Sequence, residues 1–170
     1  MTANYKLDSM FEIRKYLWEQ FTTIGIFDTD EYYSDNLNSV VIPIIPVQQS
    51  PELNQFLSGK KHIVYDKIGM SYEDNWAICC EQMLFTIYAT EISDINEIRN
   101  FMTDQFRRMD DSARDVNQFA TLSNKFRFHS IFIADISPTE PSEEIQGFFS
   151  ADVILEVKYS RVLDSVGRFL

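Results

Sequence analysis

The chain has 170 residues, of which 45% are hydrophobic and 14% aromatic, and this composition predicts a single domain over residues 1–170 with a substantial core. Its 26 acidic and 15 basic residues give a formal net charge of −11, which argues against a protein that grips nucleic-acid phosphates through a basic patch. Met1–Leu7 lacks the pattern of a signal peptide, and the longest apolar run, Val40–Val47, is too short to span a membrane, so we expect no membrane association.

The first predicted element is an amphipathic helix over Met10–Phe21. Ser9 and Glu12 have the spacing of a capping box, and apolar residues then recur at helical intervals. Gly25 follows this pattern and suits the end of a helix, because glycine readily adopts the left-handed conformation that often closes one. An acidic, turn-rich loop is expected over residues 28–39.

The next apolar run, Val40–Val47, predicts a buried strand. Pro43 and Pro46 cannot donate hydrogen bonds to a neighbouring strand, so this strand is expected at a sheet edge or to end near Pro43. Gln48–Lys61 then predicts an excursion from the core that contains one helical turn.

Two further strands are predicted over His62–Ile68 and Asn75–Ala89. The second is apolar at both odd and even positions, which predicts a central strand covered on both faces. Glu81 and Gln82 interrupt its apolar character and suggest a β-bulge at that point.

Two helices are predicted after these strands. The longer has apolar residues at helical spacing over Ile95–Met109, and Ser93 precedes it as an expected N-terminal cap. A shorter helix over Ser112–Thr121 is expected to follow it.

Two long closing strands, Phe126–Ile136 and Phe148–Tyr159, are predicted around the loop Ser137–Gly147. At about 3.3 Å per residue each spans roughly 36–40 Å, close to the ~40 Å diameter of a domain of this size, so the hairpin either crosses the domain or projects from it. The apolar face of the last strand is expected to pack on the helix Ile95–Met109, and residues 160–170 are expected to form a docking tail. These elements predict an α+β fold: a mostly antiparallel β-sheet packed against two main amphipathic helices, with a long C-terminal β-hairpin.

The sequence offers few residues for catalysis or metal binding. Cys79 and Cys80 are adjacent, lack the spacing of a metal site, and are expected to be reduced thiols inside the protein. His62 and His129 each fall in a predicted strand without the spacing of metal ligands. With no phosphate-binding glycine loop or nucleophile motif, we expect neither a catalytic residue, a metal site nor a cofactor, and hence no enzyme.

An acidic segment keeps one enzymatic alternative open. Asp28, Asp30 and Glu31 resemble part of a divalent-metal cluster, although their spacing does not force their oxygens to converge, and a solvated loop is the favoured interpretation. The remote alternative is a small metal-dependent enzyme that uses these three carboxylates. Tyr32 and Tyr33 follow them and, if exposed, suit an interface.

The element order and the closing strands resemble those of a known protein family. The ranges that carry the likeness are Met10–Phe21, Trp76–Ala89, Ile95–Met109 and Gly147–Tyr159. The chain resembles the tail terminator, or tail completion, proteins that join head and tail in long-tailed bacteriophages. The likeness spans most of the chain, and it rests on element order and on the alternation from Val153 to Tyr159.

The resemblance implies a structural virion protein. Such a protein forms a homo-oligomeric, hexameric ring that caps the tail tube and ends tube polymerisation. The ring offers a docking surface to the head–tail connector or neck proteins and lets DNA pass through its lumen. The expected partners are other copies of the chain, the tail tube protein, the connector and, in contractile tails, the sheath. The expected location is the tail or neck of the virion, assembled in the host cytoplasm. The alternative is a neighbouring connector, neck or sheath-stabilising subunit.

Three segments are expected to form interfaces, because they are predicted to be exposed and to make no contacts within their own chain. The residues in the excursion are Gln48, Pro51, Leu53, Phe56, Lys60 and Lys61; those at the hairpin tip are Glu140, Glu143 and Glu144; those in the tail are Val166, Phe169 and Leu170. Shortening the loop between the closing strands is therefore expected to harm assembly more than folding.

Overall fold

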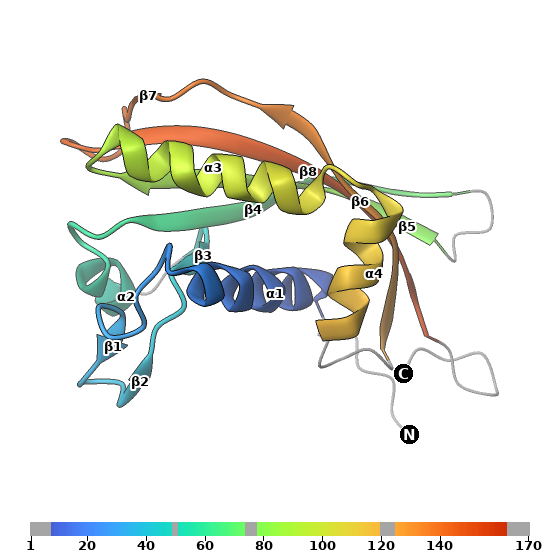
Figure 1. Cartoon of the computed structure of the whole chain (residues 1–170), viewed down its shortest axis with the longest axis horizontal. Coiled ribbons are helices and arrows are strands. Elements are labelled where there is room, and N and C mark those ends of the chain that lie inside the picture. The colour runs from blue at the N-terminus through green and yellow to red at the C-terminus, as the bar shows by residue number, and fades with distance from the viewer. Residues whose placement is uncertain (1–7, 49–50, 74–77, 120–124, 163–170) are drawn as a thin grey trace.

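A computed structural model of the chain describes residues 8–48, 51–73, 78–119 and 125–162 (Figure 1). Its helices are α1 (Ser9–Ile24), α2 (Pro51–Phe56), α3 (Ile92–Phe106) and α4 (Asp110–Phe119). Its strands are β1 (Tyr33–Ser34), β2 (Ser39–Val40), β3 (Ile44–Pro46), β4 (His62–Tyr72), β5 (Ile78–Ala89), β6 (Phe126–Ile136), β7 (Glu140–Pro141) and β8 (Phe149–Arg161).

One mixed sheet organises the domain. Its main path is β3-β4-β5-β8-β6, and β7 pairs with β8 beside it. β3 runs parallel to β4, whereas the other pairs of this sheet are antiparallel, and β1 and β2 form a separate two-stranded ribbon. The predicted α+β fold with a mostly antiparallel sheet is confirmed.

The hydrophobic core lies between one face of this sheet and the helices (Figure 1). Odd-numbered residues of β5 and β8, such as Phe85, Val153 and Leu155, are buried against α1 and α3. Full burial of a side chain of this size stabilises the fold by about 1.5–3 kcal/mol. The apolar face of β8 faces α3, as the alternation from Val153 to Tyr159 predicts, because alternate residues of a strand share one face.

The opposite face of β5 differs from the prediction. Gln82 is exposed, and Cys80, Leu84 and Thr86 are only half-buried, so the strand is central but is not covered equally on both faces. The loop after β6 crosses this face near Tyr88, where β7 lies against β8. Among the described residues, this loop, and not a second layer of helices, partly covers the apolar even positions of β5.

The closing strands cross the domain. β6 has the predicted bounds, and β8 lies between β5 and β6, where it is paired along almost its whole length. The ends of β4 and β5 instead extend past α1 and α4 at the right of Figure 1. The projecting part of the sheet is therefore the β4–β5 end and not the C-terminal hairpin.

The helix starts also differ from prediction. α1 begins at Ser9, and its N-terminal cap is Asp8, whose Oδ1 accepts a hydrogen bond from the Met10 amide at 2.9 Å. Gly25 ends α1 in the left-handed conformation, as predicted. The capping residue of α3 is Glu91, which makes no side-chain cap bond, so the predicted cap Ser93 lies inside the helix.

Two further boundaries are shifted. α4 begins at Asp110, directly after Met109, whose φ of 42° breaks the helical path, and the predicted end at Thr121 lies outside the described residues. The irregularity predicted at Glu81 and Gln82 lies on the neighbouring strand, because the register shifts between Lys67 and Gly69 of β4. The irregularity therefore lies opposite the predicted position, on β4 instead of β5.

Candidate interaction surfaces

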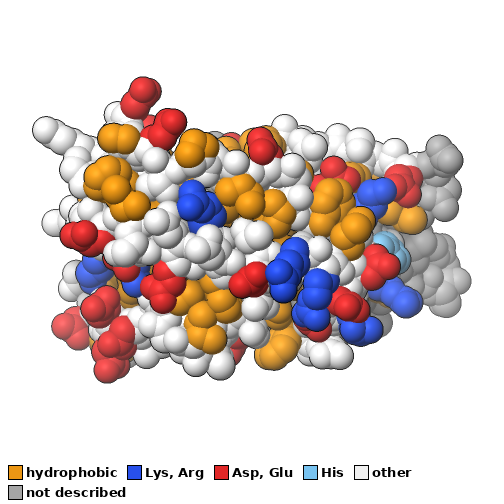
Figure 2. All heavy atoms as spheres, turned by 45° about the horizontal axis from the view of Figure 1, so that its top comes forward, with side chains coloured by type: hydrophobic (Ala, Val, Ile, Leu, Met, Phe, Trp, Pro, Cys, Tyr) orange, Lys and Arg blue, Asp and Glu red, His pale blue; other side chains and the backbone are white. Residues whose placement is uncertain are grey.

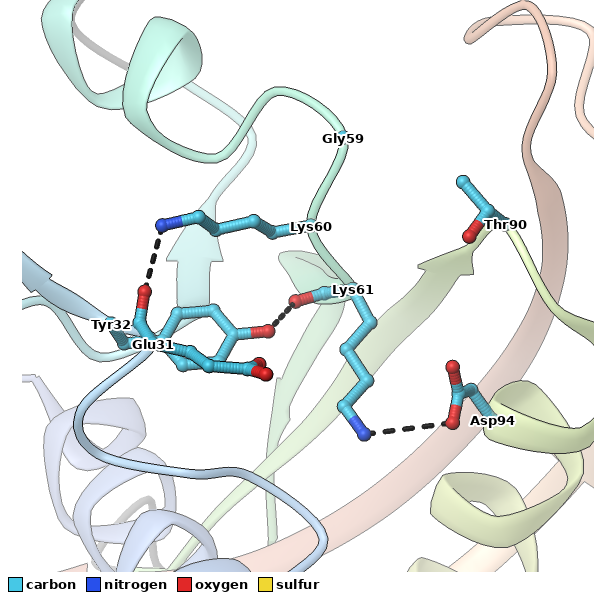
Figure 3. Close-up of a pocket in the computed structure, with 7 residues that line it drawn as sticks. All are labelled: Glu31, Tyr32, Gly59, Lys60, Lys61, Thr90 and Asp94. Carbon is cyan, nitrogen blue, oxygen red and sulfur yellow. Dashed lines mark hydrogen bonds and ion pairs between the residues drawn. The ribbon is translucent and has the colours of Figure 1, made fainter.

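The excursion after β3 folds back on the domain and lines a cavity of about 580 Å³ (Figure 3). Lys60 Nζ donates a hydrogen bond to the Glu31 carbonyl at 2.7 Å, and Lys61 Nζ forms an ion pair with Asp94 Oδ1 at 3.6 Å. The Tyr32 hydroxyl donates to the Lys61 carbonyl at 2.6 Å. These contacts tie the excursion to the acidic loop on one side and to α3 on the other.

Charge is balanced within this cavity. The lining includes Glu31 and Asp94 as well as Lys60 and Lys61, and both ammonium groups already contact oxygen atoms of the chain. Burial, followed by the nearby Glu31 carboxylate, raises the pKa of Tyr32, so its hydroxyl remains a proton donor. The contacts around this cavity therefore hold the excursion and the acidic loop together.

Tyr32 and Tyr33 have different environments. Only 1% of Tyr32 is exposed, and its ring lies edge-on to Phe27 and Trp18, so the expectation of an exposed tyrosine is wrong at this position. Tyr33 is exposed, and its hydroxyl donates to Asn38 Oδ1. Of the pair, only Tyr33 is available on the surface.

Most interface candidates in the excursion make contacts within the chain. Leu53 and Phe56 are half-buried against the core, and Lys60 Nζ lies 4.0 Å from the centre of the Phe56 ring. Gln48 is exposed, whereas Pro51 begins α2 and its side chain is outside the description. The premise that this segment has no internal contacts is wrong, and its role in an interface stays a prediction.

The hairpin tip is also anchored. Glu144 Oε2 accepts a hydrogen bond from the Tyr88 hydroxyl at 2.5 Å, and Arg99 donates to the Ser137 carbonyl at 3.3 Å and to Thr139 Oγ1 at 3.1 Å. Glu140 and Glu143 are exposed, although the backbone of Glu140 belongs to β7. The tail candidates Val166, Phe169 and Leu170 lie outside the described residues.

The excursion and the hairpin tip meet at one end of the domain. Both segments line a second cavity of about 380 Å³, which Leu57 and Gly59 share with Glu144, Ile145 and Phe148. The two segments lie far apart in the sequence, so the order of residues alone did not predict that they adjoin. Figure 2 shows acidic side chains gathered toward the left end of the face it presents, with hydrophobic side chains in separate patches.

The carboxylates of the enzymatic alternative lie on the surface. Asp28, Asp30 and Glu31 are exposed, and Asp28 Oδ1 accepts a hydrogen bond from the Asp30 amide at 3.0 Å. Within the described ranges, no three His, Cys, Asp or Glu side chains are grouped so that they could hold a metal ion. The structure therefore does not bring these three carboxylates together into a site.

The histidines and cysteines have structural surroundings. His62 is buried, stacks on Tyr88 with ring centres 5.3 Å apart, and has Nδ1 2.8 Å from the Lys60 carbonyl. Burial lowers the pKa of His62, so its imidazole is held in the neutral form. Burial also raises the pKa of the Cys79 and Cys80 thiols, which lowers the fraction of reactive thiolate.

A buried carboxylate that the sequence analysis assigned to a bulge joins α1 to the sheet. Glu81 is 1% exposed, and its oxygens accept hydrogen bonds from Ser9 Oγ at 3.0 Å and from the Tyr159 hydroxyl at 2.6 Å. Lys67 Nζ lies 3.4 Å from the same carboxylate and 2.7 Å from Asp8 Oδ1. The sequence signal for this network is a glutamate inside an otherwise apolar strand, because a buried charge requires partners.

Comparison with known proteins adds no assignment. No family model matches the sequence, and no curated protein matches it. In the described part of the chain, no helix is both long and apolar enough to cross a membrane.

Proposed function

We propose that this chain is a structural virion protein of the tail terminator type, which forms a ring on the end of a phage tail tube. The observation that carries the proposal is the arrangement of the sheet: α1, β4 and β5 come first, α3 then packs on the sheet, and the long strands β6 and β8 close it. This is the element order on which the resemblance to tail terminators rests.

The excursion and the hairpin tip supply a surface for this role. Their meeting at one end of the domain creates one composite surface from residues 51–61 and Ser137–Gly147. Their internal anchors fix the backbone, while Gln48, Glu140 and Glu143 remain exposed. A cyclic ring requires contact between two different surfaces of adjacent subunits, and an anchored surface loses less conformational entropy on binding.

The charge of the chain suits a lumen through which DNA passes. A net charge of −11 repels phosphates at long range, so DNA would move past the subunits without being retained. We therefore expect DNA to pass through the ring without being bound, and stable contacts to form between protein surfaces.

The decisive experiment measures arrest of tube growth. The purified protein is added to polymerising tail tube protein of the same phage, and tube lengths and tube ends are examined by negative-stain electron microscopy. The expected result is shorter tubes whose ends carry rings. Unchanged tube lengths with bare ends would refute the proposal, and retention by the head–tail connector but not by tubes would instead favour the connector alternative.

A matched pair of variants tests the proposed surface. Glu140→Lys together with Glu143→Lys reverses two exposed charges at the hairpin tip and is expected to weaken tube capping at least tenfold without altering the unfolding midpoint. Asp104→Lys with Asp110→Lys reverses two exposed carboxylates on α3 and α4 away from this end and serves as the control, because it makes the same change in net charge. Equal capping by both double variants would exclude the tip from the interface.

A further inference from the structure

The outer edge of β3 is protected within the chain. Arg14 Nε donates a hydrogen bond to the Ile44 carbonyl at 2.5 Å. The Ile63 amide donates to the Pro43 carbonyl, and the Val47 amide donates to the Tyr65 carbonyl. By alternation, the main-chain groups of Ile44 and Pro46 point away from β4, toward the outer edge. Pro46 has no amide hydrogen, and an edge of this kind offers little to another strand.

The edge of β6 is protected by three different groups. The Asn117 side chain accepts from the Phe128 amide at 3.0 Å and donates to the Phe128 carbonyl at 2.9 Å, and so imitates a neighbouring strand. The Ile131 amide donates to the Met109 carbonyl at 3.3 Å, and the Ile136 amide donates to the Asp135 side chain at 2.9 Å. A second chain would have to displace these contacts before it could pair with β6.

Within the described residues, the outer part of β4 lacks such protection. The last residue of β4 in register with β3 is Tyr65, and in the described part of the chain no strand lies beside Gly69–Tyr72 on that side. The Glu73 amide donates to the Ile78 carbonyl, so by alternation the N–H and C=O groups of Met70 and Tyr72 point to the open edge. Their side chains are 59% and 62% exposed.

We infer that this edge pairs with the same edge of a second copy, antiparallel and about a two-fold axis at Ser71. In that register Met70 lies opposite Tyr72 of the second copy, and the reverse pair is equivalent. Each pair exchanges both main-chain hydrogen bonds, and each places a methionine sulfur beside a tyrosine ring. Glu73 falls opposite Gly69, so no carboxylate faces a like charge.

Self-complementarity is what identifies a second copy as the occupant. Met70 and Tyr72, spaced i and i+2, present main-chain donors and acceptors that have no partner among the described residues, and the antiparallel copy presents the same two in the matching order. The contact is isologous and closes on two chains, so it is separate from the head-to-tail contacts of the proposed ring and describes the protein free of its tail partners. It covers an edge that would otherwise promote aggregation.

A disulfide across the proposed axis tests the pairing and its register. Ser71 lies directly opposite Cys80 within the chain, so the variant is Ser71→Cys with Cys80→Ser, which prevents an internal disulfide. Residues that meet at such an axis have Cα atoms about 4.5 Å apart, within the range that a disulfide spans. The expected result is a covalent dimer under mild oxidation, and Asp66→Cys with Cys80→Ser is the matched control on the same strand.

The mass in solution provides the second measurement. Light scattering is expected to give twice the 19.9 kDa of one chain. Met70→Lys with Tyr72→Lys is expected to halve that mass while the circular dichroism spectrum of the folded chain stays unchanged, because both side chains are exposed on the single chain. A monomeric parent protein at about 100 μM would overturn the inference. Equal cross-linking of the two cysteine variants would overturn the register, and with it the proposal.

Discussion

Removal of the Glu81 carboxylate is expected to destabilise the fold more than any exposed charge does. In Glu81→Ala, the hydroxyls of Ser9 and Tyr159 lose their acceptor, and Lys67 keeps Asp8 as a counter-ion. These groups belong to α1, β4 and β8, which meet at this carboxylate. The substitution therefore weakens the attachment of α1 to the sheet.

The expected loss follows from the burial of the carboxylate. A buried polar group without a partner costs about 1–3 kcal/mol, and breaking a buried ionic contact costs about 3–5 kcal/mol. Because Lys67 is partly exposed and retains Asp8, we expect a total of about 3–5 kcal/mol for Glu81→Ala, most of it from the two hydroxyls. Glu81→Gln keeps an oxygen acceptor and is expected to lose about 1–2 kcal/mol.

Urea denaturation followed by circular dichroism measures these losses, since the midpoint shifts with stability at an unchanged slope. The control is Glu73→Gln, which breaks the exposed ion pair with Lys158 and is expected to change stability by less than about 1 kcal/mol. If Glu81→Ala lost no more than Glu73→Gln, the buried network would not hold α1 to the sheet. A double-mutant cycle with Tyr159→Phe then measures the coupling directly.

The remaining predictions concern pH and the protected edge of β6. Because burial lowers the pKa of His62, the unfolded state takes up the proton more readily, so stability is full above about pH 6.5 and falls as pH decreases below it; His62→Gln should flatten this decline in urea titrations at pH 7 and pH 5.5. Asn117→Ala removes both hydrogen bonds to Phe128, so it should cost about 1–2 kcal/mol and increase aggregation measured by light scattering, whereas the exposed neighbour change Gln118→Ala should do neither.

Alternation allowed the closing strands to be predicted well. The bounds of β6 and the buried face of β8 follow from the period of two, because a slip of one residue would expose every apolar side chain of β8. The same sequence cannot give the position of β8 between β5 and β6, nor the parallel direction of β3. Those pairings join residues far apart in the chain and depend on the packing of the whole core.

The contacts of the predicted interface residues could not be inferred from neighbouring residues in the sequence. Lys60, Lys61 and Glu144 are predicted as interface residues because their segments are expected to be exposed and to make no internal contacts. Their partners Glu31, Asp94 and Tyr88 are distant in sequence. The helix caps show the same limit. Asp8 and Ser9 can both cap α1, and Asp8 takes the role while Ser9 donates to Glu81 on β5, a residue whose position relative to Ser9 only the fold determines.

The edge of β4 is exposed because this strand extends beyond β3 and beyond the start of α1. Asp8, at the start of α1, contacts Lys67, so the described helical layer ends beside the middle of β4. Met70 and Tyr72 lie beyond that point, where no described side chain bonds to their main-chain groups as Arg14 does on β3 or Asn117 on β6. Strands that remain free in solution usually carry lysine or proline at such an edge. Because two large apolar side chains stand there instead, contact with another strand is the arrangement that best satisfies both the main chain and the side chains of this segment.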